Sequence, residues 1–168
     1  MTLPPLPASQ RVRHRRRVRL LVAAAAGLAV VQGAAAFALP RLRPPGVPAG
    51  AVTAAAAVAA LWLGFRVSRW AGRWVAAARD RYAAGGGPQR LLADHLRIYV
   101  GVAAVLETIG LLGLAVAVWG AGPGLALWFQ GLQAVLALLA WPTERKLRLY
   151  LQRAEAARLD TAGEGNGA

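Results

Sequence analysis

Uncharged, mainly hydrophobic stretches alternate along the chain with short segments rich in Arg. Residues 20–40 and 44–65 carry no charged side chain, and residues 98–143 carry only one, Glu107. A hydrocarbon core about 30 Å thick needs about 20 helical residues to cross it. The first two stretches therefore each predict one membrane span, and the third is long enough for two.

The third stretch is interrupted by a Gly- and Pro-rich run at residues 120–124, which predicts a tight turn between two helices. The pattern predicts an all-α fold, an integral membrane four-helix bundle. Its spans are expected at residues 20–39, 47–65, 98–119 and 125–141. Three Trp residues lie at or near the ends of the last two spans, where indole rings favour the headgroup region: Trp119, Trp128 and Trp141.

The basic residues indicate how the chain is oriented. The net charge is +13, and 18 of the 20 Lys and Arg residues lie in residues 1–19, 66–97 and 142–168. The other two, Arg41 and Arg43, lie between the first two spans. Lys and Arg accumulate on the cytoplasmic side of membrane proteins, so both termini are expected in the cytoplasm. The preference for Arg over Lys is typical of a GC-rich bacterial genome, and we expect a multi-pass protein of the bacterial inner membrane.

The first span has an alternative interpretation as a signal peptide, because an Arg-rich start and an apolar stretch are followed by Ala34, Ala35 and Ala36. Its apolar part is about 20 residues long, whereas signal peptides have an apolar core of about 7 to 15. A retained span is therefore favoured. Cleavage would leave three spans, which the mass of the purified protein would reveal.

Two segments outside the spans have amphipathic patterns. In residues 66–97, helical spacing separates Arg66, Arg69 and Arg73 from Trp70 and Trp74, which predicts an interfacial amphipathic helix touching lipid headgroups. After Pro142, residues 142–159 predict a cytoplasmic amphipathic helix capped by Thr143. The Gly-rich composition of residues 160–168 predicts a disordered tail.

Residues suited to catalysis are scarce. The chain has no Cys, which excludes disulfides, thiolate zinc sites and a Cys nucleophile. No nucleophile with an adjacent base is apparent, so we expect no enzymatic activity, catalytic residue, cofactor or metal. His14 and His95 lack metal-ligand spacing and are expected to be solvated. The basic N-terminal segment precedes a span, so anionic lipid is favoured as its partner and nucleic acid is not.

Glu107 is the exception, because it lies about ten residues, or roughly 15 Å, into the third span and so close to the membrane midplane. An ionisable group at that depth is a functional hypothesis by default. Desolvation favours its protonated form. Gln32 and Gln133 lie at comparable depth in other spans, and hydrogen bonds to them would hold the helices together. The alternative is a proton or ion site formed by these three residues.

Small residues follow Glu107 along one side of the third span. Projection at 100° per residue places a stripe beside it, made of Ala103, Gly110, Gly113, Ala117 and Gly120. Such residues allow the backbone of a second helix to approach closely. Glu107 is therefore expected to point towards a helix contact.

Residues 107–117, about 11 of 168, resemble the carboxylate helix of the rotary ATP synthase proteolipid (c) subunit. In that family a Glu is followed six residues later by Gly, and here these positions are Glu107 and Gly113. The resemblance implies that Glu107 carries a proton or sodium ion. The Gly-packed partner helix of that family has no counterpart in the Ala-rich first two spans. Residues 97–148 also resemble small uncharacterised bacterial four-span membrane proteins, which implies a fold and no activity.

These patterns favour a small non-enzymatic membrane protein, structural or accessory to a membrane complex. Its expected partners are anionic lipid headgroups and either copies of itself or a larger complex. The alternative is an oligomeric proton or ion conductor that uses Glu107. A third option is a holin-like protein that perforates the membrane.

Overall fold

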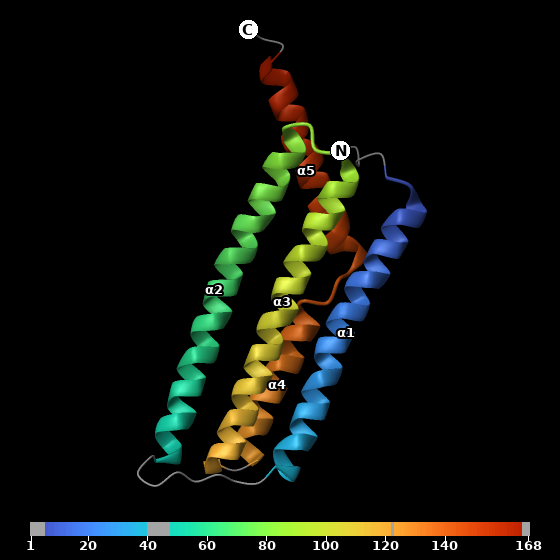
Figure 1. Ribbon diagram of the computed structural model, residues 1–168. Helices are drawn as coiled ribbons and strands as arrows, with labels where there is room; N and C mark the ends of the chain where they lie inside the picture. The colour runs from blue at the N-terminus through green and yellow to red at the C-terminus, as the bar shows by residue number, and fades with distance from the viewer. Residues whose placement is uncertain (1–5, 40–47, 122, 166–168) are drawn as a thin grey trace. The chain divides into compact units, whose positions relative to one another are not determined.

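The computed structural model describes residues 6–39, 48–121 and 123–165, and these residues form helices and no strands. Figure 1 shows their course. In chain order the elements are α1 (Ala8–Ala38), α2 (Ala49–Ala83), α3 (Pro88–Val116), the π-helical turn η1 (Ala117–Ala121), α4 (Pro123–Leu139) and α5 (Glu144–Gly165). The all-α prediction is confirmed.

Helix ends coincide with residues that cannot continue a helix or that cap one. Gly85 adopts a φ of 95°, and the amides of Gly85 and Gly86 bond back to the carbonyls of Tyr82 and Arg81. A left-handed Gly after the last helical turn is a common helix ending. Pro88 opens α3, where its missing N–H costs nothing. Thr143 caps α5, since its Oγ1 accepts from the amide of Lys146 at 3.2 Å.

Three helices are long and apolar enough to cross a membrane, namely α1, α2 and α3 together with η1. The number rises to four if α4 and α5, which are bent by 58°, are counted as one broken span. This supports a multi-pass membrane protein. The tight connection expected near residues 120–124 lies between η1 and α4. Val47, the expected first residue of the second span, lies outside the described residues.

Four helices extend past the bounds expected from the sequence. Helix α1 begins at Ala8 and α3 at Pro88, before the spans expected at residues 20–39 and 98–119. A separate interfacial helix was expected from residue 66, but α2 is one helix from Ala49 to Ala83. No Pro lies within it, so the change from apolar to amphipathic pattern occurs without a break. A disordered tail was expected from residue 160, but α5 continues to Gly165. There the Thr161 hydroxyl bonds back to the carbonyls of Ala157 and Arg158, at 3.2 and 2.9 Å. Residues 166–168 lie outside the described part.

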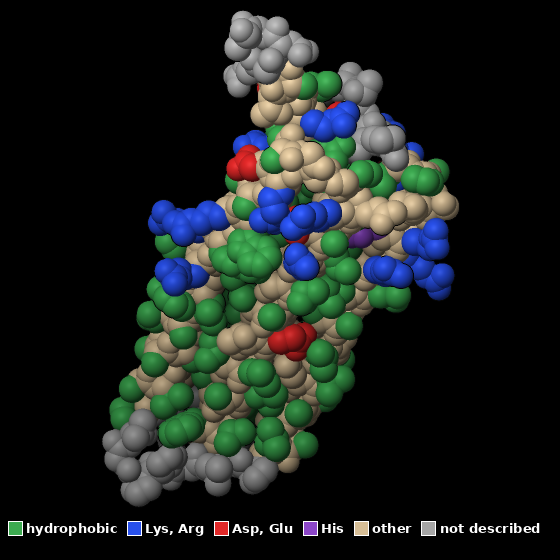
Figure 2. Space-filling view, turned by 45° about the horizontal axis from the view of Figure 1, so that its top comes forward, with side chains coloured by type: hydrophobic (Ala, Val, Ile, Leu, Met, Phe, Trp, Pro, Cys, Tyr) green, Lys and Arg blue, Asp and Glu red, His purple; other side chains and the backbone are tan. Residues whose placement is uncertain are grey.

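The chain divides into two compact units. Unit 1 comprises residues 1–20, 69–100 and 142–168, and unit 2 comprises residues 21–68 and 101–141. Unit 2 therefore contains α4 and segments of α1, α2 and α3. Its core combines a cluster of Ala56, Ala60, Ile109, Val116 and Phe129 with a smaller one of Ala36, Ala117 and Ala126. Hydrophobic side chains cover the face of unit 2 seen in Figure 2.

Unit 1 is charged, and it also has an apolar core. It holds 17 of the 20 basic residues, six in residues 1–20, six in 69–100 and five in 142–168. Figure 2 shows Lys and Arg side chains gathered on its surface. The core is made of Leu6, Tyr82, Leu91, Leu92, Leu147, Leu151 and Ala154. Three of these residues, Leu147, Leu151 and Ala154, come from the predicted amphipathic helix α5.

Candidate functional site

The candidate site is a polar cluster inside unit 2, formed by side chains from α1, α3 and α4. Gln32 lies on the buried stripe of α1 and Gln133 on that of α4, where Gln133 is 0% exposed. Glu107 lies on α3 and is half-buried. Helical spacing explains the placement, because residues three or four apart share one face. The structure thus brings together the three residues that sequence depth alone had grouped.

Two amide groups donate hydrogen bonds to the carboxylate. Nε2 of Gln32 lies 3.2 Å from Glu107 Oε2, and Nε2 of Gln133 lies 3.4 Å from Glu107 Oε1. The Gln133 amide also donates to the backbone carbonyl of Ala25 at 3.1 Å. These bonds tie α3 to α1 and α4, and α4 to α1. A carboxylate that is partly withdrawn from water requires such donors, because they replace the water it has lost.

A third amide extends the cluster. Gln130 is buried one turn before Gln133, and its Nε2 donates to the backbone carbonyl of Gly110 at 3.0 Å. All three amides therefore donate, yet among the described residues their oxygens, Oε1 of Gln32, Gln130 and Gln133, accept nothing. Buried polar atoms without a partner are rare and costly. The site consequently has spare acceptors beside a carboxylate.

Two glycines of the small-residue stripe create the space for this cluster. A Cβ at Gly110 would collide with the amide oxygens of Gln32 and Gln133 and lie 2.9 Å from Gln32 Cδ. A Cβ at Gly113 would lie 2.6 Å from Phe129 Cβ and 3.2 Å from the Ala126 carbonyl. Gly110 therefore makes room for the amides, and Gly113 for the close approach of α4.

The other members of the stripe agree with this packing where they are described. Ala103 and Ala117 are buried. Gly120 lies in η1, and its packing is outside the described part of the structure. Thr108, the neighbour of Glu107, is exposed and bonds only to the Ala104 carbonyl of its own helix, at 2.9 Å.

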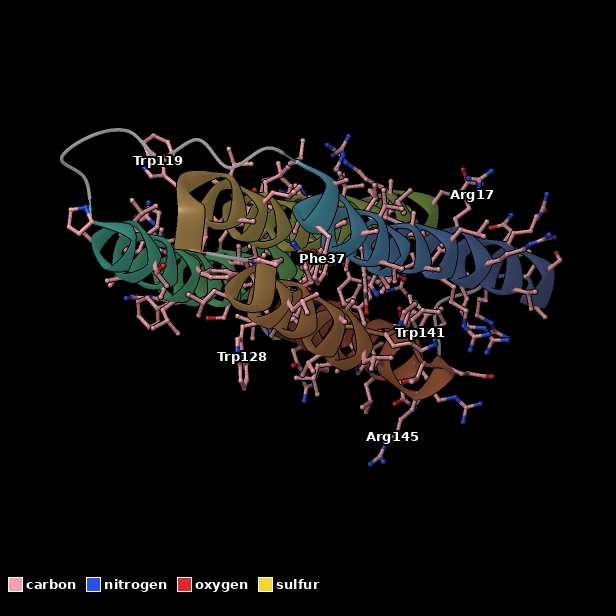
Figure 3. The ribbon with its side chains drawn as sticks, turned by 90° about the horizontal axis from the view of Figure 1, so that it is seen from below. Arg17, Phe37, Trp119, Trp128, Trp141 and Arg145 are labelled. Atoms are coloured by element: carbon pink, nitrogen blue, oxygen red, sulfur yellow. The ribbon has the colours of Figure 1, made fainter. Side chains whose placement is uncertain are left out.

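Large hydrophobic side chains on the outside of unit 2 surround the polar cluster. Examples are Val30 at 74%, Leu61 at 72% and Trp128 at 78% exposure. Figure 3 shows Trp128 pointing away from α4. An exposed apolar surface of this kind is typical of a protein in lipid or in an interface. Glu107 is the only acidic residue in unit 2.

The predicted headgroup residues lie along α2. Arg66, Arg69 and Arg73 are exposed, as is Trp74, while Trp70 is half-buried. The Trp70 and Trp74 rings pack with their centroids 4.8 Å apart, and the Arg66 guanidinium lies 5.0 Å from the Trp62 ring centre. Cation–π contact of this type suits side chains at a membrane interface.

The two histidines were expected to be solvated, and that expectation is wrong. His14 and His95 are both 7% exposed, and Nε2 of His14 lies 2.9 Å from Nδ1 of His95 in unit 1. Rings of Tyr99 and Tyr150 pack on His95 with centroids 5.0 and 4.7 Å away. Burial, followed by the charge of His14, lowers the pKa of His95 to about 3. Burial, followed by the charge of Arg17, lowers the pKa of His14. The pair is therefore neutral.

The burial of two carboxylates in unit 1 was also not predicted from the sequence. Asp94 is 2% exposed and accepts from Arg81 Nη2 at 3.0 Å and from Arg97 Nη1 at 3.2 Å. Glu155 is 4% exposed and accepts from the Tyr82 hydroxyl at 2.7 Å and from Arg158 at 2.8 Å. Burial, followed by the bond to Glu155, raises the pKa of Tyr82 to about 12. Both carboxylates hold unit 1 together.

The arrangement in unit 2 can cross-link helices, and it can also accept a proton, a water molecule or a small cation. Among the described residues no three His, Asp or Glu side chains gather as metal ligands. No protein family, curated protein or solved structure matches the chain, so the geometry alone carries the assignment.

Proposed function

We propose that the chain is a non-enzymatic integral membrane protein of the bacterial inner membrane, acting as a structural or accessory subunit of a membrane complex. In this proposal it crosses the membrane four times with both termini in the cytoplasm. The observation that carries the proposal is the polar cluster of Gln32, Glu107 and Gln133. It uses the only carboxylate of unit 2 to fix three helices together.

The outer surface of unit 2 supports the same proposal. Its exposed side chains include large hydrophobic residues of α1, α2 and α4, which suit lipid or a partner helix. Glu107 is only half-buried within the described structure, and a carboxylate edge exposed to hydrocarbon is costly. A partner helix that supplies a hydrogen-bond donor would remove that cost.

The topology can be tested with single cysteines, because the chain has none of its own. Ser9→Cys and Asp160→Cys should resist a membrane-impermeant maleimide in intact cells and react after permeabilisation. Gly124→Cys should react in intact cells. All three positions are exposed, so burial would not block labelling. Labelling of Ser9→Cys or Asp160→Cys from outside would overturn the proposed orientation.

The accessory role predicts that the chain does not exist alone in the membrane. After extraction in mild detergent, the protein mass of the particle, measured by light scattering, should exceed the 17.6 kDa of one chain. Cross-linking in native membranes before extraction should give the same larger species. A 17.6 kDa monomer under both conditions contradicts the proposal.

The unpaired amide oxygens favour a second candidate function, conduction of protons or a small cation through Glu107. The unpaired oxygens of Gln32 and Gln133, whose amides bond to the carboxylate, are suitable ligands for a cation or for a hydrogen-bonded water. Conduction also requires a continuous path, which an oligomer would supply.

Proton flux into proteoliposomes distinguishes the two functions. Conduction predicts flux with the wild type and its loss in Glu107→Gln. Thr108→Val is the matched control, since Thr108 is next in the helix and bonds only within α3. It should keep wild-type flux. Absence of flux in the wild type rejects conduction, and equal flux in wild type and Glu107→Gln rejects the role of Glu107.

A further inference from the structure

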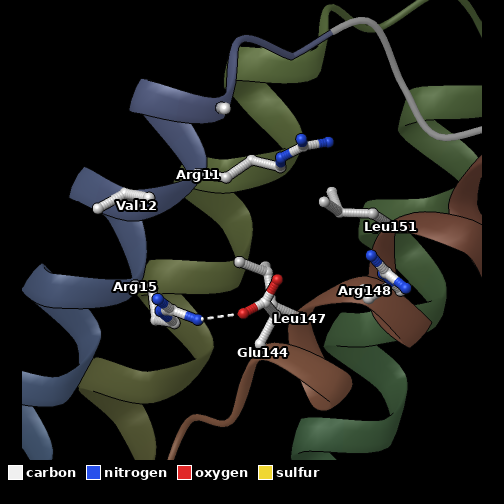
Figure 4. Close-up of a pocket in the computed structure, with 8 residues that line it drawn as sticks. Arg11, Val12, Arg15, Glu144, Leu147, Arg148 and Leu151 are labelled. Atoms are coloured by element: carbon white, nitrogen blue, oxygen red, sulfur yellow. Dashed lines mark hydrogen bonds and ion pairs between the residues drawn. The ribbon is translucent and has the colours of Figure 1, made fainter.

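A small cavity lies in unit 1 between the first turns of α1 and α5, and neither function proposed above uses it. Its volume is about 150 Å³, and Figure 4 shows its lining. The polar part of the lining is made by Arg11 and Arg15 of α1 and by Glu144 and Arg148 of α5. The two residues on each helix are four apart, so each helix presents both to the same hollow.

The charges in this cavity do not balance. Arg15 pairs with Glu144 at 2.7 Å. Within the described residues neither Arg11 nor Arg148 has a carboxylate partner or a side-chain hydrogen bond. Three guanidinium groups against one carboxylate leave a charge of +2 at the cavity. Like charges held around one hollow repel each other, and an anion between them would relieve that repulsion.

Guanidinium groups are suited to one class of anion in particular. Their planar fork of N–H donors matches two oxygens of a phosphate, which gives a bidentate contact. Figure 4 shows the Arg11 and Arg148 side chains on opposite helices of the cavity. A phosphate placed there would therefore accept hydrogen bonds from both α1 and α5.

The remaining walls of the cavity are apolar, which restricts the class of ligand further. Leu147 and Leu151 line the cavity and are 7% and 1% exposed. At about 30 Å³ per water molecule, the cavity has the volume of roughly five waters. That accommodates a phosphate and the first atoms of an ester, while the rest of the molecule would have to lie outside. An anionic phosphate ester fits this combination better than a free inorganic ion.

We propose that this cavity binds the phosphate group of an anionic phosphate ester, held by Arg11 and Arg148. A phospholipid headgroup and a soluble phosphate supply the same chemistry. The site differs from the exposed Arg and Trp side chains of α2, because it is a hollow with a defined lining. It is also independent of Glu107, so failure of either function above leaves it unaffected.

Binding to the full-length protein in detergent micelles tests the site. The probes are short-chain phosphatidylglycerol, phosphatidylcholine with the same chains, and inorganic phosphate, each titrated with microscale thermophoresis. The double variant R11Q/R148Q should weaken binding of phosphatidylglycerol roughly tenfold or more, since each basic residue near an anionic headgroup contributes appreciably. Phosphatidylcholine, whose headgroup has no net charge, should bind weakly to all variants.

The matched control is R13Q/R145Q. It removes the same charge from the same two helices, at exposed positions that do not line the cavity. Figure 3 shows Arg145 pointing away from α5. This control should change binding less than about twofold if the cavity is the site. Equal losses in both double variants, or no loss in R11Q/R148Q, overturn the proposal.

A second double variant and a competition experiment test how the site recognises its ligand. R11K/R148K retains the charge and loses the guanidinium fork, so its affinity should fall between the wild type and R11Q/R148Q, and wild-type affinity in it contradicts bidentate recognition. It also serves as the test if R11Q/R148Q fails to fold. If inorganic phosphate displaces phosphatidylglycerol, the site recognises the phosphate group alone. If phosphatidylglycerol binds and inorganic phosphate does not displace it, the site recognises the lipid. Lack of binding by both probes rejects the site.

Discussion

Units 1 and 2 satisfy their buried polar groups in opposite ways. In unit 1 the buried carboxylates Asp94 and Glu155 each accept from Arg, and Glu155 also accepts from Tyr82. In unit 2 the carboxylate of Glu107 accepts only from neutral amides. The amide oxygens of that cluster have no donor within the described residues.

The difference follows from where the charges lie. Unit 1 contains six of the seven acidic residues and 17 of the 20 basic ones. A buried carboxylate there can therefore pair with an Arg whose side chain remains partly exposed to water. Unit 2 has a single acidic residue and, among its described residues, a single basic one, Arg66. Ion pairs therefore stabilise unit 1. Unit 2 depends instead on close packing and on the weaker hydrogen bonds that its Gln side-chain amides donate.

The largest effect is expected for Asp94→Asn in unit 1. The change leaves Arg81 and Arg97 facing a neutral amide, and hydrogen bonds to charged groups contribute up to about 3 kcal/mol. The control is Asp80→Asn, where the carboxylate is 70% exposed and its pair with Arg79 is long, at 3.6 Å. Thermal unfolding in detergent should show a clear loss of stability for Asp94→Asn and almost no loss for the control. Equal losses would mean that burial of Asp94 does not matter.

In unit 2, Gly113→Ala should destabilise the protein by about 2 kcal/mol, as extra atoms in a packed core commonly do. The new methyl group would lie 2.6 Å from Phe129 Cβ, which cannot move without shifting α4. Gly131→Ala is the control, because nothing lies within 4 Å of a Cβ there. It should be neutral or slightly stabilising, since Ala is the better helix former. The same thermal measurement on both variants tests whether packing governs unit 2.

Acidification should weaken unit 1 through its histidine pair. Because the folded protein holds the pKa of His95 near 3, while an exposed His titrates near 6.5, the unfolded chain binds the proton first. The contribution of the neutral His95 to stability is fully present above about pH 6.5 and is lost as the pH drops towards 3. Between pH 7 and pH 5 the loss should approach about 2 kcal/mol, at about 1.4 kcal/mol per pH unit.

The unfolding midpoint measured at several pH values tests this. The double variant His14→Gln/His95→Gln should have a nearly flat profile over the same window, because it removes both titrating groups. A variant profile as steep as that of the wild type would assign the pH dependence to other residues.

The smallest effect is expected for Glu107→Gln, at or below about 1 kcal/mol, which is the usual contribution of one hydrogen bond. The new amide can donate to the unpaired oxygen of Gln32 or Gln133 and so replace one lost bond with another. The same substitution in unit 1, Glu155→Gln, should cost more because Tyr82 and Arg158 lose a charged acceptor. Comparable losses in the two variants would remove the distinction between the units.

Much of unit 2 could be predicted from the sequence. The uncharged stretches identify long apolar helices, and equal depth in the spans is enough to group Gln32, Glu107 and Gln133. The stripe of small residues indicates the face of α3 that packs, because Gly and Ala at spacings of three and four leave room for the backbone of a neighbouring helix. What the sequence could not supply is which atoms remain unpaired, since that depends on side-chain orientation.

Unit 1 was harder to predict because its buried residues are surrounded by Arg. His14 lies in an Arg-rich segment that looks solvated, but it continues the spacing of the buried residues Val18, Val22 and Ala25 on α1. That spacing was the available signal. For Asp94 the sequence offered no such signal, since a carboxylate between arginines is usually exposed. Only the folded helices show that Asp94 is buried.

If α2 crosses a bilayer as proposed, its unbroken course would suit bilayers of different thickness. Its 35 residues form a rod about 52 Å long, whereas the hydrocarbon layer measures about 30 Å. Arg66, Arg69 and Arg73 follow one another at about one-turn intervals, so in that orientation each would serve in turn as the anchor at the phosphate level. A thicker membrane would then enclose a further turn of the helix without any change of fold.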